Sequence, residues 1–283
     1  MPAIDYEKEY DNRGRVPEHP EIFARWEAEA KAYRAASPGA KLGLRYGSSR
    51  RQSIDLFPAK DDGAMTPLAL FIHGGWWRSL DPALFSQVAK GPNTHGVTVA
   101  VVGYDLCPQV GIPAIIEQMR AACLYLWRRT RKRIFVYGHS AGGHLAACMV
   151  AQDWRALAAD APADLVPSAY AISGVFDLAP ILHVTPNEDI RLDEEQARAC
   201  SPLLWKVPAG RRFDAVVGAL ESSEFLRQSK TIADAWRSRG TDTRYEEIAG
   251  ANHYTVVDPL ADPDSAMTRR VAQMATLTHA MEF

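Results

Sequence analysis

The stretch that decides the fold is IFVYGHSAGG, residues 134–143. It opens with four apolar residues that favour a β-strand, and the helical pattern HLAACMVAQ follows it from residue 144. Between the two, Gly138, Ser140 and Gly142 form the pattern G-x-S-x-G, which is typical of a sharp strand-to-helix turn. Glycine suits the positions two residues from the serine, because the strand and the helix must approach closely there. We therefore expect a strained turn that presents Ser140 as a nucleophile.

The rest of the chain continues this alternation of apolar strands and helical patterns. We expect strands at 53–57, 68–72, 97–104, 134–137, 170–173, 213–220 and 244–248, and helices at 21–36 and from 112 to about 129. Apolar strands separated by helices indicate a mostly parallel sheet with helices on both faces. The sequence thus predicts the α/β-hydrolase fold, as a single domain over residues 1–283. It also predicts an N-terminal arm and helix at about 1–45 and a small lid-like insertion at about 180–208.

A second glycine motif follows an earlier strand. Gly74, Gly75 and Trp76 come shortly after the apolar run 68–72. Acyl transfer to a serine passes through an intermediate with a negative oxygen, which backbone N–H groups must stabilise. One donor is the N–H of the residue after the nucleophile, here Ala141, and another comes from a glycine-rich loop after an earlier strand. We expect Gly75 and Trp76 to supply donors to this oxyanion hole, with Gly74 as the hinge.

The order of residues along the chain selects a base and an acid. In this fold a catalytic triad runs Ser, then Asp or Glu, then His. His253 lies in the loop after the last expected strand, so we expect it to take the proton of Ser140. Glu221 directly follows the preceding strand, where a carboxylate can hold the histidine tautomer and stabilise the imidazolium. Asp177, which follows the strand that begins at residue 170, is the alternative acid.

Composition limits the kind of partner. The chain has 283 residues, of which 47% are hydrophobic and 23% are charged, an ordinary globular balance. The formal net charge is −2, so no dominant charge attracts a nucleic acid or an anionic membrane. The basic run at 128–133 closes an apolar helix, where cations suit the negative end of the helix dipole. We expect neither nucleic acid nor membrane as a partner.

The cysteines and the N-terminus indicate the compartment. The four cysteines fit neither a CxxC pattern nor a zinc-binding spacing, so we expect no metal and a reduced, cytoplasmic protein. The first twenty residues are polar and acidic and contain no apolar core, which is unlike a signal peptide.

The two glycine motifs resemble those of the kynurenine formamidases (arylformamidases), a family within the hormone-sensitive-lipase-like hydrolases with an HGGxW oxyanion segment. The similar segments are HGGWWRSLD (73–81), YDLCP (104–108), GHSAGGH (138–144), SGVFDL (173–178), 187–192 with 201–202, and ESSEF (221–225) with 228–229. The resemblance spans roughly residues 54–258. The family usually has aspartate at the position of Glu221, whereas some bacterial relatives of the family have glutamate there, as this sequence does. The resemblance implies cofactor-free hydrolysis of an N-formyl aryl amide, the type substrate being N-formylkynurenine.

The resemblance also implies a small aromatic substrate. Trp77, Tyr104, His139 and Tyr254 lie beside the expected catalytic elements and are the candidates to bind it. The alternative for each is ordinary packing, because large aromatic side chains are often part of a core.

Three functions are compatible with these residues. The first is hydrolysis of a small N-formyl or N-acyl arylamine through an acyl-enzyme. The second is a carboxylesterase for short-chain or aryl esters, and the third is a receptor that binds ligands on the same fold without catalysis. The joint presence of Ser140, Glu221 and His253 favours an enzyme. A homodimer is one expected oligomeric state.

Overall fold

The computed structural model describes residues 4–281 and contains one eight-stranded sheet. The strands are β1 (Lys41–Arg45), β2 (Ser53–Phe57), β3 (Leu68–Ile72), β4 (Thr98–Val102), β5 (Ile134–His139), β6 (Ser168–Ile172), β7 (Arg212–Gly218) and β8 (Asp242–Ile248). Their order across the sheet is β1-β2-β4-β3-β5-β6-β7-β8. β2 runs antiparallel to both β1 and β4, and every other neighbouring pair is parallel. The predicted α/β-hydrolase fold is confirmed.

Strand β1 was not among the expected strands, because the prediction assigned residues up to about 45 to the N-terminal arm and helix. Its sequence, KLGLR, lies at the edge of the sheet and is mostly exposed. An edge strand with two solvated faces needs no alternation of apolar residues. Gly43 has a φ of +68° where the pairing with β2 shifts register. Its two alternating apolar residues, Leu42 and Leu44, form too short a pattern to predict a strand.

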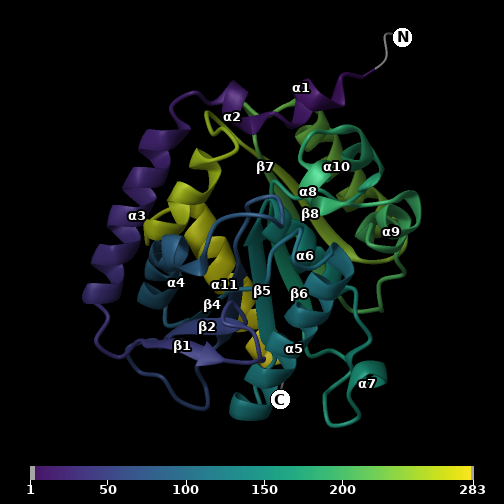
Figure 1. Cartoon of the computed structure of the whole chain (residues 1–283). Helices are drawn as coiled ribbons and strands as arrows, with labels where there is room; N and C mark the ends of the chain where they lie inside the picture. The colour runs from purple at the N-terminus through teal and green to yellow at the C-terminus, as the bar shows by residue number, and fades with distance from the viewer. Residues whose placement is uncertain (1–3, 282–283) are drawn as a thin grey trace.

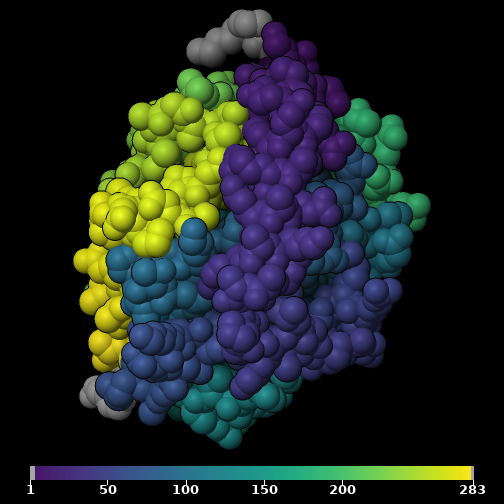
Figure 2. Space-filling model, turned by 90° about the vertical axis from the view of Figure 1, so that its left-hand side faces the viewer, coloured from purple at the N-terminus to yellow at the C-terminus, as the bar shows by residue number. Residues whose placement is uncertain are grey.

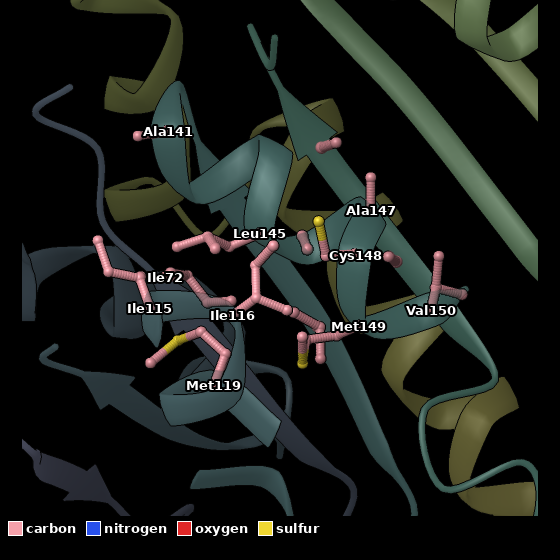
Figure 3. Packing of buried hydrophobic residues seen from close by; sticks show 14 of the residues in the cluster. Ile72, Ile115, Ile116, Met119, Ala141, Leu145, Ala147, Cys148, Met149 and Val150 are labelled. Atoms are coloured by element: carbon pink, nitrogen blue, oxygen red, sulfur yellow. The ribbon is translucent and has the colours of Figure 1, made fainter. Parts of the chain in front are cut away.

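Helices cover both faces of the sheet (Figure 1). Helices α5 (Ile112–Thr130), α6 (Ala141–Val150) and α10 (Ser223–Arg237) contribute to one apolar cluster. The other cluster includes α3 (His19–Ala35), η1 (Pro82–Ala89), η4 (Thr255–Ala261) and α11 (Ala266–Ala280), with α4 (Lys90–Thr94) beside them. In Figure 3, Leu145 of α6 lies close to Ile115 and Ile116 of α5 and to Ile72 of β3. The strands that carry the predicted site are thus buried from both sides.

The basic run at 128–133 lies where helix α5 ends. Arg131 adopts a left-handed conformation as the C-cap of α5. Arg128 pairs with Asp160 at 3.1 Å and Arg133 with Asp164 at 3.0 Å. These cations therefore have acidic partners on the same surface, as well as the favourable end of the helix dipole.

The N-terminal segment packs more closely than the surface arm that the sequence predicted. It forms two short helices, α1 (Tyr6–Tyr10) and α2 (Asn12–Arg15), before α3. Tyr10 is 3% exposed and Trp26 is 2% exposed, and the indole of Trp26 donates a hydrogen bond to Asp258 at 2.9 Å. In Figure 2 this segment forms a continuous band across one side of the molecule. At its upper end in Figure 1, α1 and α2 cross above the sheet.

The predicted lid-like region consists of short helical pieces. These are η2 (Ala179–His183), α8 (Asn187–Ile190), α9 (Glu194–Ala199) and η3 (Pro202–Leu204); a further short helix, α7 (Trp154–Leu157), lies before β6. A proline lies in the first turn of both η2 and η3, where its fixed φ and missing N–H suit the start of a helix. Within residues 4–281, no helix combines the length and the apolar character that crossing a membrane requires.

Replacing Leu145 with alanine tests the packing of α6. Leu145 is fully buried, so Leu145→Ala should lower the free energy of unfolding by about 2–5 kcal/mol through lost burial and a residual cavity. Leu277→Ala is the control, because Leu277 is 39% exposed on α11 and should change that free energy by no more than about 0.5 kcal/mol. Urea denaturation measures both. Equal unfolding midpoints for the two variants would contradict the assigned core.

Candidate active site

The turn between β5 and α6 has the close packing that its glycines predicted. A Cβ built on Gly138 would lie 2.3 Å from the carbonyl oxygen of Gly142, and one on Gly142 would lie 1.9 Å from that of Ile72. Neither position therefore accepts a side chain. Ser140 between them has φ 57° and ψ −118°, a backbone conformation that costs energy in a non-glycine residue. It is the N-cap of α6, and its side chain emerges at the carboxyl edge of the sheet.

Three parallel strands bring the predicted serine, acid and base together. Ser140 follows β5, Glu221 follows β7 and His253 follows β8. The Nε2 atom of His253 lies 3.1 Å from Oγ of Ser140, and its Nδ1 atom lies 2.6 Å from Oε2 of Glu221. All three side chains are buried or nearly so. This geometry allows the imidazole to accept the serine proton while the carboxylate orients the imidazole and balances its charge.

Both carboxylate oxygens of Glu221 have hydrogen-bond partners. Its Oε1 atom accepts hydrogen bonds from the backbone N–H of Gly218 at 2.7 Å and from the hydroxyl of Ser173 at 2.5 Å. Its Oε2 atom faces His253. A buried carboxylate needs such donors, since it has lost its water. The carboxylate of the alternative acid, Asp177, accepts a hydrogen bond from the backbone N–H of Ala179, whereas Nδ1 of His253 faces Glu221.

The other acidic side chains near Glu221 in sequence have different partners. Asp214 pairs with Arg270 at 2.7 Å, and Glu224 pairs with Arg227 at 2.7 Å. Neither carboxylate contacts His253 in the hydrogen bonds of the described residues. Glu221 is therefore the acidic residue of this arrangement.

Two further histidines support the site as neutral rings. His139 Nε2 donates to the backbone carbonyl of His253 at 2.7 Å. Burial, together with the nearby His253, holds the pKa of His139 well below its usual range. His73 stacks on Tyr104 with ring centroids 4.4 Å apart, and burial lowers its pKa to about 4. Both rings therefore brace the backbone around Ser140 and add no positive charge near neutral pH.

The predicted oxyanion loop lies against the serine. A Cβ on Gly74 would lie 2.8 Å from the backbone carbonyl oxygen of His139 and 3.0 Å from the Cβ of Ser140, so only glycine allows this approach without a shift of the backbone. Gly75 has a φ of +112° and would bring a Cβ within 2.4 Å of the Ser79 carbonyl oxygen. Within residues 4–281, no hydrogen bond uses the backbone N–H of Gly75, Trp76 or Ala141. These donors are therefore free to bind an oxyanion, and their assignment to an oxyanion hole stays a prediction.

A cavity of about 210 Å³ opens beside Ser140. Its walls come from α1 and α2, the start of α3, the loop after β3, the turn at Ser140, residues 184–186 of the lid region and the loop that carries His253. Its aromatic lining consists of Tyr10, Phe23, Trp26, Trp76 and Tyr254, with the imidazoles of His139 and His253. Burial raises the pKa of Tyr254 to about 12, so this phenol stays neutral at physiological pH.

Two of the four predicted substrate-binding residues line this cavity and two do not. His139 and Tyr254 do. Trp77 is 1% exposed and packs edge-on against His144, with ring centroids 5.2 Å apart. Tyr104 is fully buried and donates a hydrogen bond from its hydroxyl to the carbonyl of His73 at 2.8 Å. The prediction for Trp77 and Tyr104 is wrong, because both rings turn into the core beneath the oxyanion loop.

The N-terminal contribution to the cavity was missed by the sequence analysis. Five residues of α1, α2 and the junction between them line the cavity, namely Glu7, Tyr10, Asp11, Asn12 and Arg13. The polar composition of this segment predicts only a surface location, and no motif connects it to the catalytic turn. Its role in shaping the cavity follows from tertiary packing alone.

The fold and the site geometry together define an α/β hydrolase. The chain belongs to the alpha/beta hydrolase fold family, whose model matches residues 69–257. It is 28% identical over 242 residues to the kynurenine formamidase of Salmo salar, covering 82% of this chain and 81% of the relative. It is 24% identical to the isoprenylcysteine α-carbonyl methylesterase of Arabidopsis thaliana, covering 79% of this chain and 59% of the relative.

A solved structure is similar over nearly the whole chain. The crystal structure of a protein of Silicibacter sp. TM1040, provisionally described as a thioesterase, has a TM-score of 0.84 and 30% sequence identity. The match covers 95% of this chain and 99% of the other. The similarity to the kynurenine formamidase of Salmo salar, together with the family model, confirms the expected resemblance to kynurenine formamidases. The protein is a hydrolase of the kind that acts on amides or esters.

Replacing Gly142 tests the close approach at the turn. Gly142→Ala should lower the free energy of unfolding by about 1–3 kcal/mol or more, because the new Cβ would overlap the Ile72 carbonyl oxygen. Gly63→Ala is the matched control, since a Cβ there meets nothing within 4 Å. Thermal and urea unfolding would measure both variants. A Gly142→Ala variant as stable as wild type would contradict the geometry of the turn.

Proposed function

We propose that the protein is a serine hydrolase that cleaves a small N-formyl or N-acyl arylamine through an acyl-enzyme. The observation that carries this proposal is the position of the His253 imidazole, 3.1 Å from Ser140 Oγ on one side and 2.6 Å from the Glu221 carboxylate on the other. The relation to kynurenine formamidases supports the choice of an amide substrate.

The first half of the reaction acylates the serine. Ser140 Oγ attacks the carbonyl carbon as its proton passes to Nε2 of His253. The resulting oxyanion accepts hydrogen bonds from the N–H groups of Ala141 and of the loop that contains Gly75 and Trp76. The C–N bond then breaks, and the arylamine leaves with the proton that His253 returns to it.

The second half regenerates the enzyme. A water molecule gives a proton to His253 while its oxygen attacks the acyl carbon. The bond from that carbon to Ser140 Oγ breaks, the serine recovers its proton and the carboxylic acid leaves. Glu221 accepts the hydrogen bond from Nδ1 of His253 throughout and stabilises the imidazolium that forms in each half. No step requires a cofactor.

The aromatic lining of the cavity supports an aryl leaving group. Trp76 and Tyr254 border the cavity that Ser140 faces, and Phe23 extends the same wall. Flat apolar rings bury an aromatic substrate and favour edge-on or offset contacts with it. N-formylkynurenine, the type substrate of the related family, is the first compound to test.

A carboxylesterase is the second candidate. The similarity to the plant methylesterase and to the thioesterase-like protein favours it, because Ser140, His253 and Glu221 could equally transfer an acyl group from an ester to the serine. A panel of N-formylkynurenine, N-acyl anthranilates and p-nitrophenyl esters, compared by kcat/KM, distinguishes the two. The proposal expects the highest kcat/KM for an N-formyl or N-acyl arylamine. Preference for the esters over every amide would favour the second candidate.

Removing the serine tests the nucleophile. Ser140→Ala should lower kcat by on the order of 10⁶-fold and leave only the weak activity of the oxyanion donors. A fluorophosphonate probe should label wild-type protein at Ser140, as peptide mapping would report, and should not label the variant. A folded wild-type protein that stays unlabelled would instead indicate the receptor without catalysis.

Neutralising the acid tests the triad. Glu221→Gln should lower kcat by on the order of 10⁴-fold, because the amide cannot balance the imidazolium or fix its tautomer. Asp214→Asn is the matched control, since Asp214 is also a buried carboxylate of β7 but pairs with Arg270. Its kcat should match wild type per folded molecule. Equal kcat losses in the two variants would argue against a specific role for Glu221.

A further inference from the structure

Helix α1 forms part of the cavity wall beside Ser140, and Tyr10 is its one buried residue. We infer that Tyr10 is a positioning residue. Its ring holds Trp76 of the oxyanion loop in place. Through Phe225, it also holds the imidazole of His253 in the orientation that the proposed reaction needs. This inference rests on the proposed function, because it concerns the same site.

The ring of Tyr10 contacts two elements of the site at once. It packs edge-on against Trp76, with ring centroids 6.0 Å apart and planes at 72°. It packs in the same way against Phe225, at 5.4 Å and 69°. Phe225 in turn lies 4.5 Å from the ring of His253. A column of aromatic rings thus connects the N-terminal helix to the oxyanion loop and to the base.

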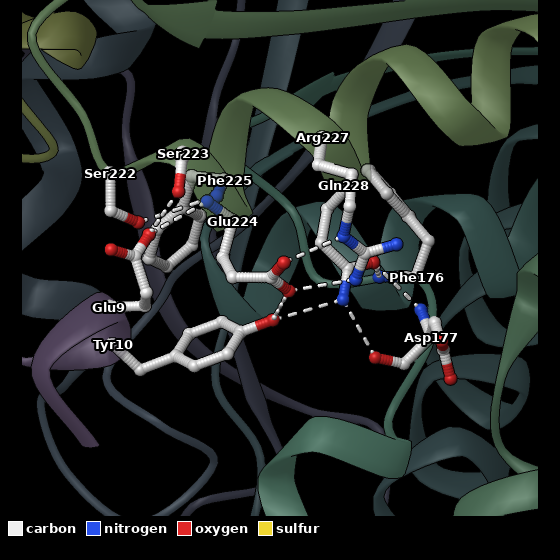
Figure 4. Close-up of polar contacts among 10 residues, drawn as sticks. All are labelled: Glu9, Tyr10, Phe176, Asp177, Ser222, Ser223, Glu224, Phe225, Arg227 and Gln228. Carbon is white, nitrogen blue, oxygen red and sulfur yellow. Dashed lines mark hydrogen bonds and ion pairs between the residues drawn. The ribbon is translucent and has the colours of Figure 1, made fainter. Parts of the chain in front are cut away.

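The hydroxyl of Tyr10 fixes the orientation of that ring (Figure 4). It donates a hydrogen bond to Oε2 of Glu224 at 3.2 Å and accepts one from Nε2 of Gln228 at 3.0 Å. Glu224 is anchored by two contacts of 2.7 Å to Arg227. Gln228 is anchored because its Oε1 atom accepts hydrogen bonds from the backbone N–H groups of residues 176 and 177, each at 2.9 Å. Each partner of the hydroxyl is therefore held by the body of the fold.

The helix that carries Tyr10 is tied to the segment that carries the acid. The carboxylate of Glu9 accepts hydrogen bonds from the hydroxyl of Ser223 at 2.7 Å and from the N–H of Glu224 at 3.0 Å. A carboxylate at the N-terminus of α10 also suits the positive end of that helix dipole. These contacts begin two residues after Glu221. The N-terminal segment and the acid loop therefore form one connected unit.

The imidazole of His253 needs this support because hydrogen bonds fix it only in its own plane. Nδ1 and Nε2 are directed by Glu221 and Ser140, and neither contact resists displacement of the ring toward its faces. Phe225 and His139 pack near the ring, with centroids 4.5 Å and 4.9 Å away. A displacement of about 1 Å in such a group can cost about 10²-fold in rate. Tyr10 packs against Phe225, so the loss of its ring should let the imidazole of His253 shift from its position.

Three variants separate the contributions of Tyr10. Tyr10→Ala removes the ring, and Tyr10→Phe keeps the ring but removes the hydroxyl. Tyr33→Ala is the control, since Tyr33 also lies in the N-terminal segment and packs on Phe57, away from the cavity. For each variant, the measurements are kcat and KM on the best substrate of the panel, the rate of Ser140 phosphonylation by a small fluorophosphonate, and the melting temperature.

The ring should matter more than the hydroxyl. Tyr10→Ala should lower kcat and the phosphonylation rate by about tenfold or more, with a smaller change in KM. Tyr10→Phe should recover both rates to within about threefold of wild type, and Tyr33→Ala should leave both unchanged per folded molecule. The phosphonylation rate reports the Ser140–His253 pair directly, so a loss there cannot come from substrate binding alone.

Other outcomes overturn the inference. A lower melting temperature for Tyr10→Ala with both rates within about twofold of wild type would show that Tyr10 only stabilises the fold. If Tyr10→Ala does not fold, Tyr10→Leu replaces it as the ring-removing variant, and wild-type rates there would overturn the inference equally. Absence of labelling and turnover in wild-type protein would instead defeat the proposed function itself.

Discussion

The structure depends on the close approach of β3, β5 and α6 around the serine. The carbonyl oxygen of Ile72 occupies the space that a side chain on Gly142 would need, and Gly142 does the same to Gly138. With the backbone packed so tightly, the chain can pass from strand to helix only through the positive φ of Ser140. Ala141 is the first residue of α6, where a backbone N–H has no intrahelical partner, and no other group of residues 4–281 accepts a hydrogen bond from it. The backbone strain at Ser140 and the position of its side chain at the carboxyl edge of the sheet therefore have one common cause.

The sheet converts this local turn into a complete site. Parallel strands end at the same edge, so Ser140, Glu221 and His253 meet although 113 residues separate the serine from the histidine. The buried carboxylate is stable there because β6 and β7 supply donors from Ser173 and Gly218. A carboxylate held by three partners can orient the base and balance its charge without moving. The site is thus prepared before any substrate arrives.

The N-terminal segment closes the site from a distant part of the sequence. Helices α1 and α2 cross the carboxyl edge of the sheet and are tied to α10 through Glu9 and Tyr10. They place polar side chains of the segment around the cavity and one aromatic ring against its walls. The shape of the cavity is therefore set by residues of α1 and α2 as well as by the turn at Ser140 and the loop after β3.

Local sequence determined the catalytic turn, the order of the strands along the chain, and the identities of the serine, acid and base that the structure brings together. It could do so because glycines at fixed offsets, apolar runs and chain order are local properties. It did not determine β1, an exposed edge strand with only two alternating apolar residues. It also did not determine the directions of Trp77 and Tyr104, because a large aromatic ring suits the wall of a cavity and a core equally well. The involvement of Tyr10 was equally hidden, because contacts across 214 residues depend on how the chain packs. Such choices were decided only by the tertiary structure, since they follow from the volume and hydrogen-bond partners that distant segments leave available.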